Sequence, residues 1–300
     1  MLIVGMLVGW LGVTLSACAQ HDSEPIIQGK TLSVWLQQYN STAVSGGEPK
    51  EQAEKAVRLI GTNAIPALLK MITQSSFWPS GRVTVNIIGI DGFVILGATA
   101  SNAVPALVKI FEDRKSPSSQ VSAAYALAGV GLGATAAIPA LLRAATNSES
   151  NTHALAFMVL ADIPASCEQT IPIATQALSD TNFSVKINAM LVLGKCGSSA
   201  KESVPALVEL STNTNFGLRS AACDALGKIH SLPDITLPAL VACLSDPAAI
   251  VRREAAWNLG NFGILAKEAV PVLVELRNDK DAQVRSAAEE ALKKINLEKN

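Results

Sequence analysis

The sequence predicts an all-α fold, an α-solenoid of about eight stacked antiparallel helix pairs. The segment ESVPALVEL at residues 202–210 returns as EAVPVLVEL at 268–276, with only two changes. The segment ITLPALVAC at 235–243 lies halfway between them, so the chain repeats with a 33-residue period. A fixed period of this size is typical of solenoids, in which each unit buries its apolar face only against its neighbours.

Three residue columns keep this step along the chain. The proline column contains Pro271, Pro238, Pro205, Pro172 and Pro139 at 33-residue steps, then Pro105 after 34 and Pro66 after 39. The leucine column contains Leu127, Leu160, Leu193, Leu226, Leu259 and Leu292. The alanine column contains Ala123, Ala156, Ala189, Ala222, Ala255 and Ala288. Columns that stay apolar in every unit predict the contacts between units.

Each unit predicts two helices, which we name A and B. In KESVPALVELSTN the proline suits the first turn of a short helix A, where its missing N–H costs nothing, and four apolar residues share one face: Val204, Leu207, Val208 and Leu210. After a polar turn, FGLRSAACDALGKI carries the apolar stripe of helix B: Leu218, Ala222, Leu226 and Ile229. Glycines late in B are expected to help end it: Gly194, Gly227 and Gly260.

The segments SVPALVEL, AVPVLVEL, IVRREAAWNLG and QVRSAAEEAL resemble HEAT repeats, specifically the bilin-lyase-like bacterial subclass. The consensus of that subclass is roughly A-V-P-A-L for helix A and V-R-x-x-A-A-x-A-L-G for helix B. The resemblance covers residues 60 to 296 and implies a HEAT-type solenoid. Its motif residues are structural, so it says more about fold than about function.

Two polar columns belong to the same pattern. The first lies in the turn between A and B and contains Asn147, Asp180, Asn213, Asp246 and Asp279. The second lies near the start of B and contains His153, Lys186, Arg219, Arg252 and Arg285. Asp and Asn in that turn are expected to accept hydrogen bonds from the free N–H groups at the start of B. The resemblance to HEAT repeats implies ladders between these columns, and we interpret them as structural.

Two units depart from the pattern. The segment between Pro66 and Pro105 is six residues too long, and its stretch IIGIDGFVILG holds three glycines and β-branched residues that weaken a helix. Its register is left open. In the unit at 152–172, ADIPASCEQT replaces the usual Leu-Gly, so helix B is expected to stop at Ile163, before Pro164.

The two ends of the array have their own signatures. Residues 31–61 predict an N-terminal capping helix pair, with Leu32, Trp35 and Leu36 facing inward and Pro49 at the start of the second helix. About seven HEAT-like repeats are then expected over 62–300. The last of them ends in EEALKKINLEKN, whose charges give the polar outer face that a terminal repeat needs.

The first residues predict export. Residues 1–19 form an apolar signal peptide, and Leu15-Ser16-Ala17-Cys18 resembles a lipobox at 15–18, which implies lipidation of Cys18. Two alternatives are cleavage after Ala19, at an Ala-x-Ala site, and an uncleaved anchor, although no Lys or Arg precedes the apolar run. Residues 20–30 are a polar linker. We expect a periplasmic or cell-envelope protein that contacts the membrane only through this end.

The remaining cysteines give no disulfide framework. Cys243 falls in a column shared with Leu210 and Leu276, so we expect a buried apolar side chain. Cys167, Cys196 and Cys223 are unevenly placed and form no CxxC. An exported chain permits disulfides, but this spacing favours none, and the oxidation state is left open.

Composition and motifs argue against catalysis and nucleic-acid binding. The net charge of −1, with no clustering of Lys and Arg, offers no basic surface for DNA or RNA. None of the histidines, His21, His153 and His230, has partners at metal-ligand spacing, so no metal, cofactor or catalytic residue is expected. The stretch GVGLGA at 129–134 is interpreted as the end of a helix B, because no strand precedes it.

A partner-binding surface is predicted on the solvent side of the B helices, which line the concave surface in HEAT solenoids. In the B helix at 251–262 the inward residues leave Arg253 and Trp257 on the opposite face. The 33-residue step from Trp257 then predicts an apolar strip rimmed by charge: Tyr125, Met158, Ile187, Leu191, Asp224, Arg253, Trp257 and Glu290. The alternative is that superhelical twist tucks these side chains between adjacent B helices.

These observations favour a non-catalytic protein-interaction scaffold with an unidentified protein partner. A bilin-lyase-like enzyme or accessory subunit is the alternative, suggested only by the subclass resemblance and opposed by the export signal. A nucleic-acid-binding HEAT protein is a second alternative, opposed by export and by the neutral charge.

Overall fold

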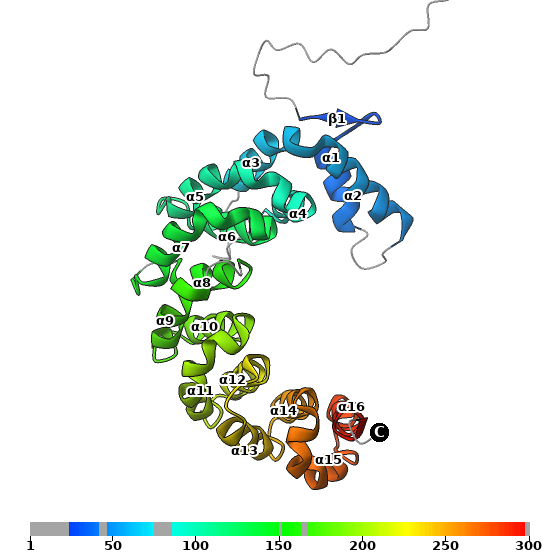
Figure 1. Cartoon of the computed structure of the whole chain (residues 1–300). Coiled ribbons are helices and arrows are strands. Elements are labelled where there is room, and N and C mark those ends of the chain that lie inside the picture. The colour runs from blue at the N-terminus through cyan, green and yellow to red at the C-terminus, as the bar shows by residue number, and fades with distance from the viewer. Residues whose placement is uncertain (1–23, 42–46, 75–85, 150–151, 164–166, 298–300) are drawn as a thin grey trace, which may run out of the picture.

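The computed structural model describes residues 24–41, 47–74, 86–149, 152–163 and 167–297. The predicted signal peptide and Cys18 therefore lie outside the described residues. Helix pairs stack one after another into an open arc, with the B helices on the concave side and the A helices on the convex side (Figure 1). The described residues form an all-α solenoid of the predicted kind, and the only strands among them are two short ones at its N-terminal end.

The helices alternate between the two layers along the chain. The first pair is α1 (Leu32–Ser41) and α2 (Glu48–Ile60). The A helices are α3 (Ile65–Thr73), α5 (Val104–Glu112), α7 (Ile138–Ala145), α9 (Cys167–Ala177), α11 (Val204–Leu210), α13 (Pro233–Cys243) and α15 (Val270–Leu276). The B helices are α4 (Ile87–Leu96), α6 (Pro117–Val130), α8 (His153–Ala161), α10 (Phe183–Lys195), α12 (Phe216–Ile229), α14 (Ala249–Asn261) and α16 (Ala282–Leu297).

A β-hairpin covers the N-terminal end of the array. Strands β1 (Ile26–Ile27) and β2 (Lys30–Thr31) pair antiparallel within the segment expected to be a linker. Trp35 of α1 donates from Nε1 to the carbonyl of Ile27 at 3.1 Å, and the ammonium of Lys30 lies 4.2 Å from the centre of the Trp35 ring. Leu32, Trp35 and Leu36 are buried, as predicted.

The predicted columns form the core between repeats. Every member of the alanine column is fully buried, and the leucine column is buried from Leu127 to Leu259. Leu292, in the last repeat, is only half-buried because no further repeat covers it. The face assigned to each helix from the 33-residue period is therefore the face that packs.

Short 3₁₀ turns connect each B helix to the next A helix in most units. Their first residue is a glycine in the left-handed region, with φ between 54° and 59°: Gly61, Gly97, Gly131, Gly197 and Gly263. A side chain there would be strained, which explains the glycine. His230, one repeat after Gly197, also has a positive φ, of 51°, but its ψ of 46° is that of a left-handed helix, whereas ψ is −138° at Gly61 and Gly97. These residues end the B helices.

The glycines at 194, 227 and 260 have a different role from the one predicted. They lie inside α10, α12 and α14, before the residue that caps each helix. A Cβ on Gly260 would lie 2.8 Å from the Cα of Ala291, and a Cβ on Gly227 would overlap the side chain of Asn258. These glycines let neighbouring B helices approach closely, and period alone does not separate that role from helix termination.

Both irregular units form helices within the residues that the structure describes. Residues 87–96 form α4 in spite of its glycines. One of these glycines has a packing role, because Gly92 lies so close to Leu68 of α3 that a Cβ would overlap the leucine side chain. Asn86 caps this helix by accepting from the N–H of Gly89 at 3.0 Å. Helix α8 ends at Ala161, two residues before the expected end at Ile163, and Ile163 is fully buried.

The capping of the B helices differs from the prediction. The carboxylate or amide of the turn column accepts from the N–H two residues on, as Asp246 does from Ala248 at 2.8 Å, and so stabilises the turn itself. The helix is capped by the residue two positions later: Asn182 accepts from Ser184, Asn215 from Gly217 and Asp281 from Gln283, each at 2.8 Å. In α14 that position is Ala248, whose side chain makes no cap.

We expect Ala248→Asn to stabilise the protein by about 1 kcal/mol. The backbone of Ala248, with φ −86° and ψ 122°, already matches that of Asn215, with φ −84° and ψ 119°. The new side chain would therefore reach a free N–H of the first turn without rearrangement. The measurement is urea unfolding followed by circular dichroism. The matched variant Asn215→Ala should lose a similar amount, and equal stability of both variants with the parent would contradict the capping column.

Two stretches, Ile87–Glu112 and Pro117–Ala145, are long and apolar enough by composition to cross a membrane. Each consists of a B helix, a 3₁₀ turn and the next A helix, so neither is one straight helix. Glycines with positive φ, Gly97 and Gly131, turn the chain between the two helices. Packing between repeats accounts for their apolar character, since their buried residues belong to the core.

Candidate functional site: the concave surface and its supporting ladder

A ladder of charged side chains joins the turns of consecutive repeats. Arg219 clamps Asp246 of the next repeat, from Nε to Oδ2 at 2.6 Å and from Nη2 to Oδ1 at 2.8 Å. Arg252 holds Asp279 with the same two bonds, both 2.8 Å. Each arginine also donates from Nη1 to two turn carbonyls of its own repeat, those of Asn213 and Thr214 or those of Asp246 and Pro247. The predicted ladder is thus present.

Burial and pairing set the charges of this ladder. The hydrogen bonds from Arg252 outweigh burial and hold the pKa of Asp279 below its ordinary value. Burial raises the pKa of Asp246, but hydrogen bonds from Arg219 and from the N–H of Ala248 lower it by more. Both carboxylates therefore stay ionised at neutral pH. Further up the array, His153 Nδ1 lies 3.9 Å from Asp180 Oδ2.

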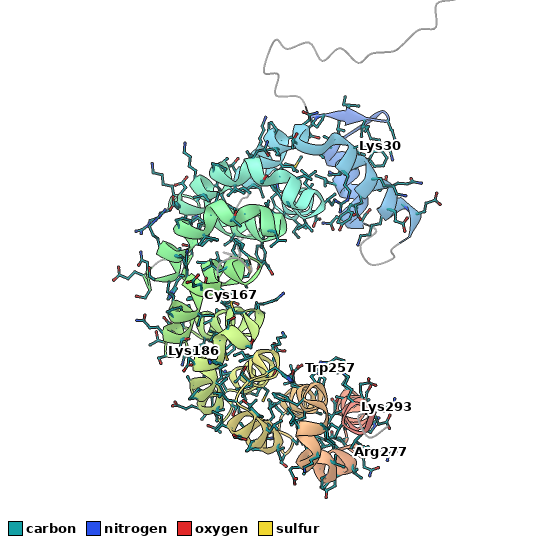
Figure 2. The ribbon with its side chains drawn as sticks, in the orientation of Figure 1. Lys30, Cys167, Lys186, Trp257, Arg277 and Lys293 are labelled. Atoms are coloured by element: carbon teal, nitrogen blue, oxygen red, sulfur yellow. A yellow bond between two sulfur atoms is a disulfide. The ribbon has the colours of Figure 1, made fainter. Side chains whose placement is uncertain are left out.

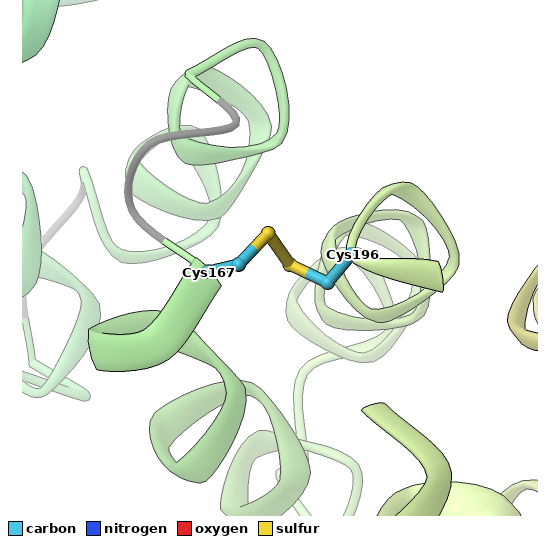
Figure 3. The surroundings of a disulfide bond; sticks show 2 residues. All are labelled: Cys167 and Cys196. Atoms are coloured by element: carbon cyan, nitrogen blue, oxygen red, sulfur yellow. A yellow bond between two sulfur atoms is a disulfide. The ribbon is translucent and has the colours of Figure 1, made fainter. Parts of the chain in front are cut away.

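Cys167 and Cys196 form a disulfide (Figure 3). Cys167 begins α9, Cys196 follows the end of α10, and their Cα atoms are 5.6 Å apart, within the ordinary range. The spacing in the sequence did not favour this bond, and the oxidation state that it left open is settled here as a disulfide. Cys223 and Cys243 are free and buried, as expected for Cys243.

The predicted partner-binding residues all belong to the B helices that line the concave surface. Tyr125 and Trp257 are exposed, by 41% and 48%. Met158, Ile187 and Leu191 are half-buried and pack against the core, so the twist of the array partly tucks them between neighbouring helices. Asp224 is half-buried and accepts from Lys228 at 2.6 Å. The five uncharged positions of the predicted set are therefore two exposed aromatic residues separated by three half-buried apolar residues.

Three of these residues line one groove between α14 and α16. It has a volume of about 610 Å³ and is lined by Arg253, Glu254, Trp257, Gln283, Ser286, Ala287 and Glu290. Trp257 lies on the inner side of the arc in Figure 2, close to α16. Arg253 Nη1 donates to Gln283 across the groove at 2.6 Å, and its Nη2 donates to Glu254 at 2.6 Å.

Sequence reasoning missed four lining residues of this groove, Glu254, Gln283, Ser286 and Ala287, and it also missed the cation beside Trp257. The ammonium of Lys294 lies 4.3 Å from the centre of the Trp257 ring and donates to Asn261 at 2.9 Å. A cation at this distance from an indole is an attractive contact. Lys294 lies one helix turn beyond Glu290 on α16, so the signal was its spacing on the same helix face.

The groove can hold an apolar or aromatic side chain on Trp257 between carboxylates and a guanidinium. No group of three or more His, Cys, Asp or Glu side chains that could hold a metal ion occurs in the described ranges. An exposed ring with charges of both signs beside it is an arrangement that can bind a chain segment in one orientation.

Comparison with known proteins supports the repeat architecture. Residues 171–260 and 231–293 match the family model for HEAT repeats. This part of the chain is therefore similar to HEAT repeats. The same 33-residue step continues towards the N-terminus from Pro172 to Pro139, and the same helix pairs follow it. A search of curated proteins finds no match.

Several solved structures are similar to this chain. One is an engineered protein, 23% identical over 88% of this chain and 78% of its own, with a TM-score of 0.49. A designed armadillo repeat protein in complex with the peptide (KR)4 is 19% identical over 89% of this chain and 100% of its own, with a TM-score of 0.42. Kap121p bound to Pho4p is 12% identical over 89% of this chain and 33% of its own, with a TM-score of 0.64.

Proposed function

We propose that the protein is a non-catalytic interaction scaffold of the bacterial cell envelope, which binds a segment of a partner protein along the concave surface of its B helices. The observation that carries the proposal is Trp257, which is 48% exposed at a groove with charged walls. A large exposed aromatic ring beside a guanidinium is the kind of side-chain pair that dominates protein interfaces. Kap121p, which has a similar fold, is bound to Pho4p in its structure.

Two observations support export. The stretch Leu15–Cys18 resembles a lipobox, and the disulfide Cys167–Cys196 is a bond typical of oxidising compartments such as the periplasm. Cytosolic thiols are kept reduced, so a structural disulfide favours an exported chain. An envelope location would also separate this protein from bilin chromophores and nucleic acids in the cytosol.

The binding surface is tested by site-specific photocrosslinking in cells. A photoreactive phenylalanine analogue is placed at Trp257 on the concave surface or at Glu209, which is exposed on α11 of the convex layer. We expect one discrete crosslinked partner from position 257 and none from position 209. Equal crosslinking from both positions would rule out the concave site. Purified protein should bind neither bilin nor duplex DNA, and binding of either would favour an alternative.

We expect the double variant Tyr125→Ser, Trp257→Ser to lose capture of the crosslinked partner while its melting temperature falls only slightly. Both rings are exposed, so their removal leaves the core intact. Leu191→Ser is the matched control, because Leu191 lies between them but packs against the core. It should lower the melting temperature more than the double variant. A double variant that unfolds, or that captures the partner unchanged, would contradict the proposal.

We expect the mature protein to begin at a lipidated Cys18. It should partition into detergent, because the acyl chains hold it at the membrane, and Cys18→Ser should leave it unprocessed or release it. The measurement is intact mass together with detergent partitioning. An unmodified chain that begins at Gln20 would show instead that the signal is cleaved after Ala19.

A further inference from the structure

The charge ladder stops at an arginine that has no carboxylate partner. Arg285 repeats the position of Arg219 and Arg252, and its Nη1 donates to the carbonyls of Asp279 and Lys280 at 2.8 and 3.2 Å. In the two earlier repeats, Nε and Nη2 clamp an aspartate of the following repeat. No such partner of Arg285 is found among the described residues. The guanidinium is thus held in place with its carboxylate-binding edge open.

Other residues around Arg285 can be identified by comparison with an internal groove between α11 and α13. We call the surface that they form with Arg285 the end seat; it consists of Val274, Arg277, Asn278 and Arg285. That groove, of about 290 Å³, is lined on one side by Val208, Ser211, Thr212 and Arg219, and on the other by residues of the next repeat that include Asp246. Two repeats later, the first side recurs as Val274, Arg277, Asn278 and Arg285. Val274 is 46% exposed there, and Arg277 stands in place of the neutral Ser211.

Among the described residues, the cations around this seat are not paired with the carboxylates near them, which include the exposed Glu275. The described residues include no ion pair of Arg277 or Arg285, and Lys280 is exposed beside them. Of the nearby carboxylates, Asp279 is held by Arg252, and Asp281 accepts from the backbone at the start of α16. Glu289 lies one turn beyond Arg285, and no ion pair joins the two. Arg277 is labelled at this end of the array in Figure 2.

A full further repeat does not fit this end. The positions equivalent to Glu289 in earlier repeats are buried small or apolar residues such as Cys223 and Ala256. The position of the close-packing Gly260 is taken by Lys293, whose side chain is 69% exposed. A helix packed here as another B helix would bury a charge. The open part is therefore the turn and the A-helix side, around Arg285.

We infer that this end seat, formed by Val274, Arg277, Asn278 and Arg285, binds an acidic segment of a partner protein. The carboxylate of an Asp in a turn would accept two bonds from Nε and Nη2 of Arg285, as Asp246 does from Arg219. Small apolar residues beside it would cover Val274, as Ala239 and Ala242 adjoin Val208 in the internal groove. This seat is separate from the concave groove and does not depend on it.

The probe is a capped heptapeptide, LSDPAAI, which copies residues 244–250 and so the turn that Arg219 holds. It is titrated into arginine-labelled protein while the Nε–Hε signal of Arg285 is followed by nuclear magnetic resonance. We expect a saturable shift of that signal and at least tenfold weaker binding of LSNPAAI. R285Q and R277Q should weaken LSDPAAI binding, whereas R58Q, an exposed arginine at the other end of the array, should not change it.

The variant R285K tests whether the two-bond geometry of the guanidinium, and not only its positive charge, is needed for binding. Its melting temperature also shows whether the variant is still folded. It keeps the cation but cannot form the two parallel bonds, so it should also bind at least tenfold more weakly while melting like the parent. Equal shifts with LSDPAAI and LSNPAAI, or unchanged binding by R285Q, would overturn the inference. Concentration-dependent dimerisation that protects Arg285 without peptide would assign the seat to a second copy and would also overturn it.

Discussion

Replacing Leu226 by alanine is expected to lower the free energy of unfolding by about 2–5 kcal/mol. Leu226 is fully buried in α12, at the centre of the array, between repeats on both sides. Alanine would remove three carbon atoms and leave a cavity that the stacked helices cannot close, because each is fixed by its neighbours. The measurement is urea unfolding followed by circular dichroism.

The control for this prediction is the same substitution at the end of the array. Leu292 belongs to the same column but is only half-buried, so Leu292→Ala should cost clearly less. Lys228→Ala, an exposed change in the same helix as Leu226, should cost under about 0.5 kcal/mol even though Lys228 pairs with Asp224. Equal unfolding curves for Leu226→Ala and Lys228→Ala would mean that the packing face is wrong.

Arg252→Ala is expected to destabilise the protein by about 3 kcal/mol. The side chains of Arg252 and Asp279 are each only 8% exposed, and the substitution leaves the Asp279 carboxylate buried without its cation. It also frees the carbonyls of Asp246 and Pro247. The matched control is Arg58→Ala, because Arg58 also lies 2.8 Å from a carboxylate, that of Glu54, but is 55% exposed. That change should cost under about 1 kcal/mol.

The same pair predicts a pH dependence. The pKa of Asp279 is lower in the folded protein than in the unfolded chain, so its contribution to stability is complete above the unfolded pKa of about 3.9. It is lost as the pH falls below that value and through the folded pKa. The stability difference between the parent and Arg252→Ala should therefore shrink in this acidic range. A difference that stays constant down to pH 2 would show that the lost bonds to the carbonyls dominate.

The period of the sequence predicted most of the fold because a solenoid repeats its contacts with its residues. The buried leucine and alanine columns followed from the 33-residue step, and the resemblance to HEAT repeats implied the clamp of Arg219 on Asp246. The period does not show what surrounds a recurring glycine. Gly227 and Gly197 recur equally well, yet one admits a neighbouring helix and the other ends a helix.

The disulfide was missed for a different reason. Spacing along the chain identifies disulfide-rich frameworks, whereas the distance between these two cysteines in space is set by how helices A and B pair. In an antiparallel pair the start of helix A and the end of helix B lie at the same edge, and Cys167 and Cys196 occupy these two places. The predicted concave strip was partly wrong for the same reason. Leu191 is half-buried by the twist between consecutive repeats, and spacing along the chain does not give that rotation.

The exposed Lys293 has a consequence for how such an array lengthens. A whole 33-residue unit that carries the arginine, duplicated just before Asp246 or just before Asp279, would meet a glycine on the helix before it, Gly227 or Gly260, and its arginine would find that aspartate in the unit after it. The same unit appended after residue 297 would meet the lysine side chain instead. Lengthening by tandem copying is therefore easier at these two internal boundaries than after α16.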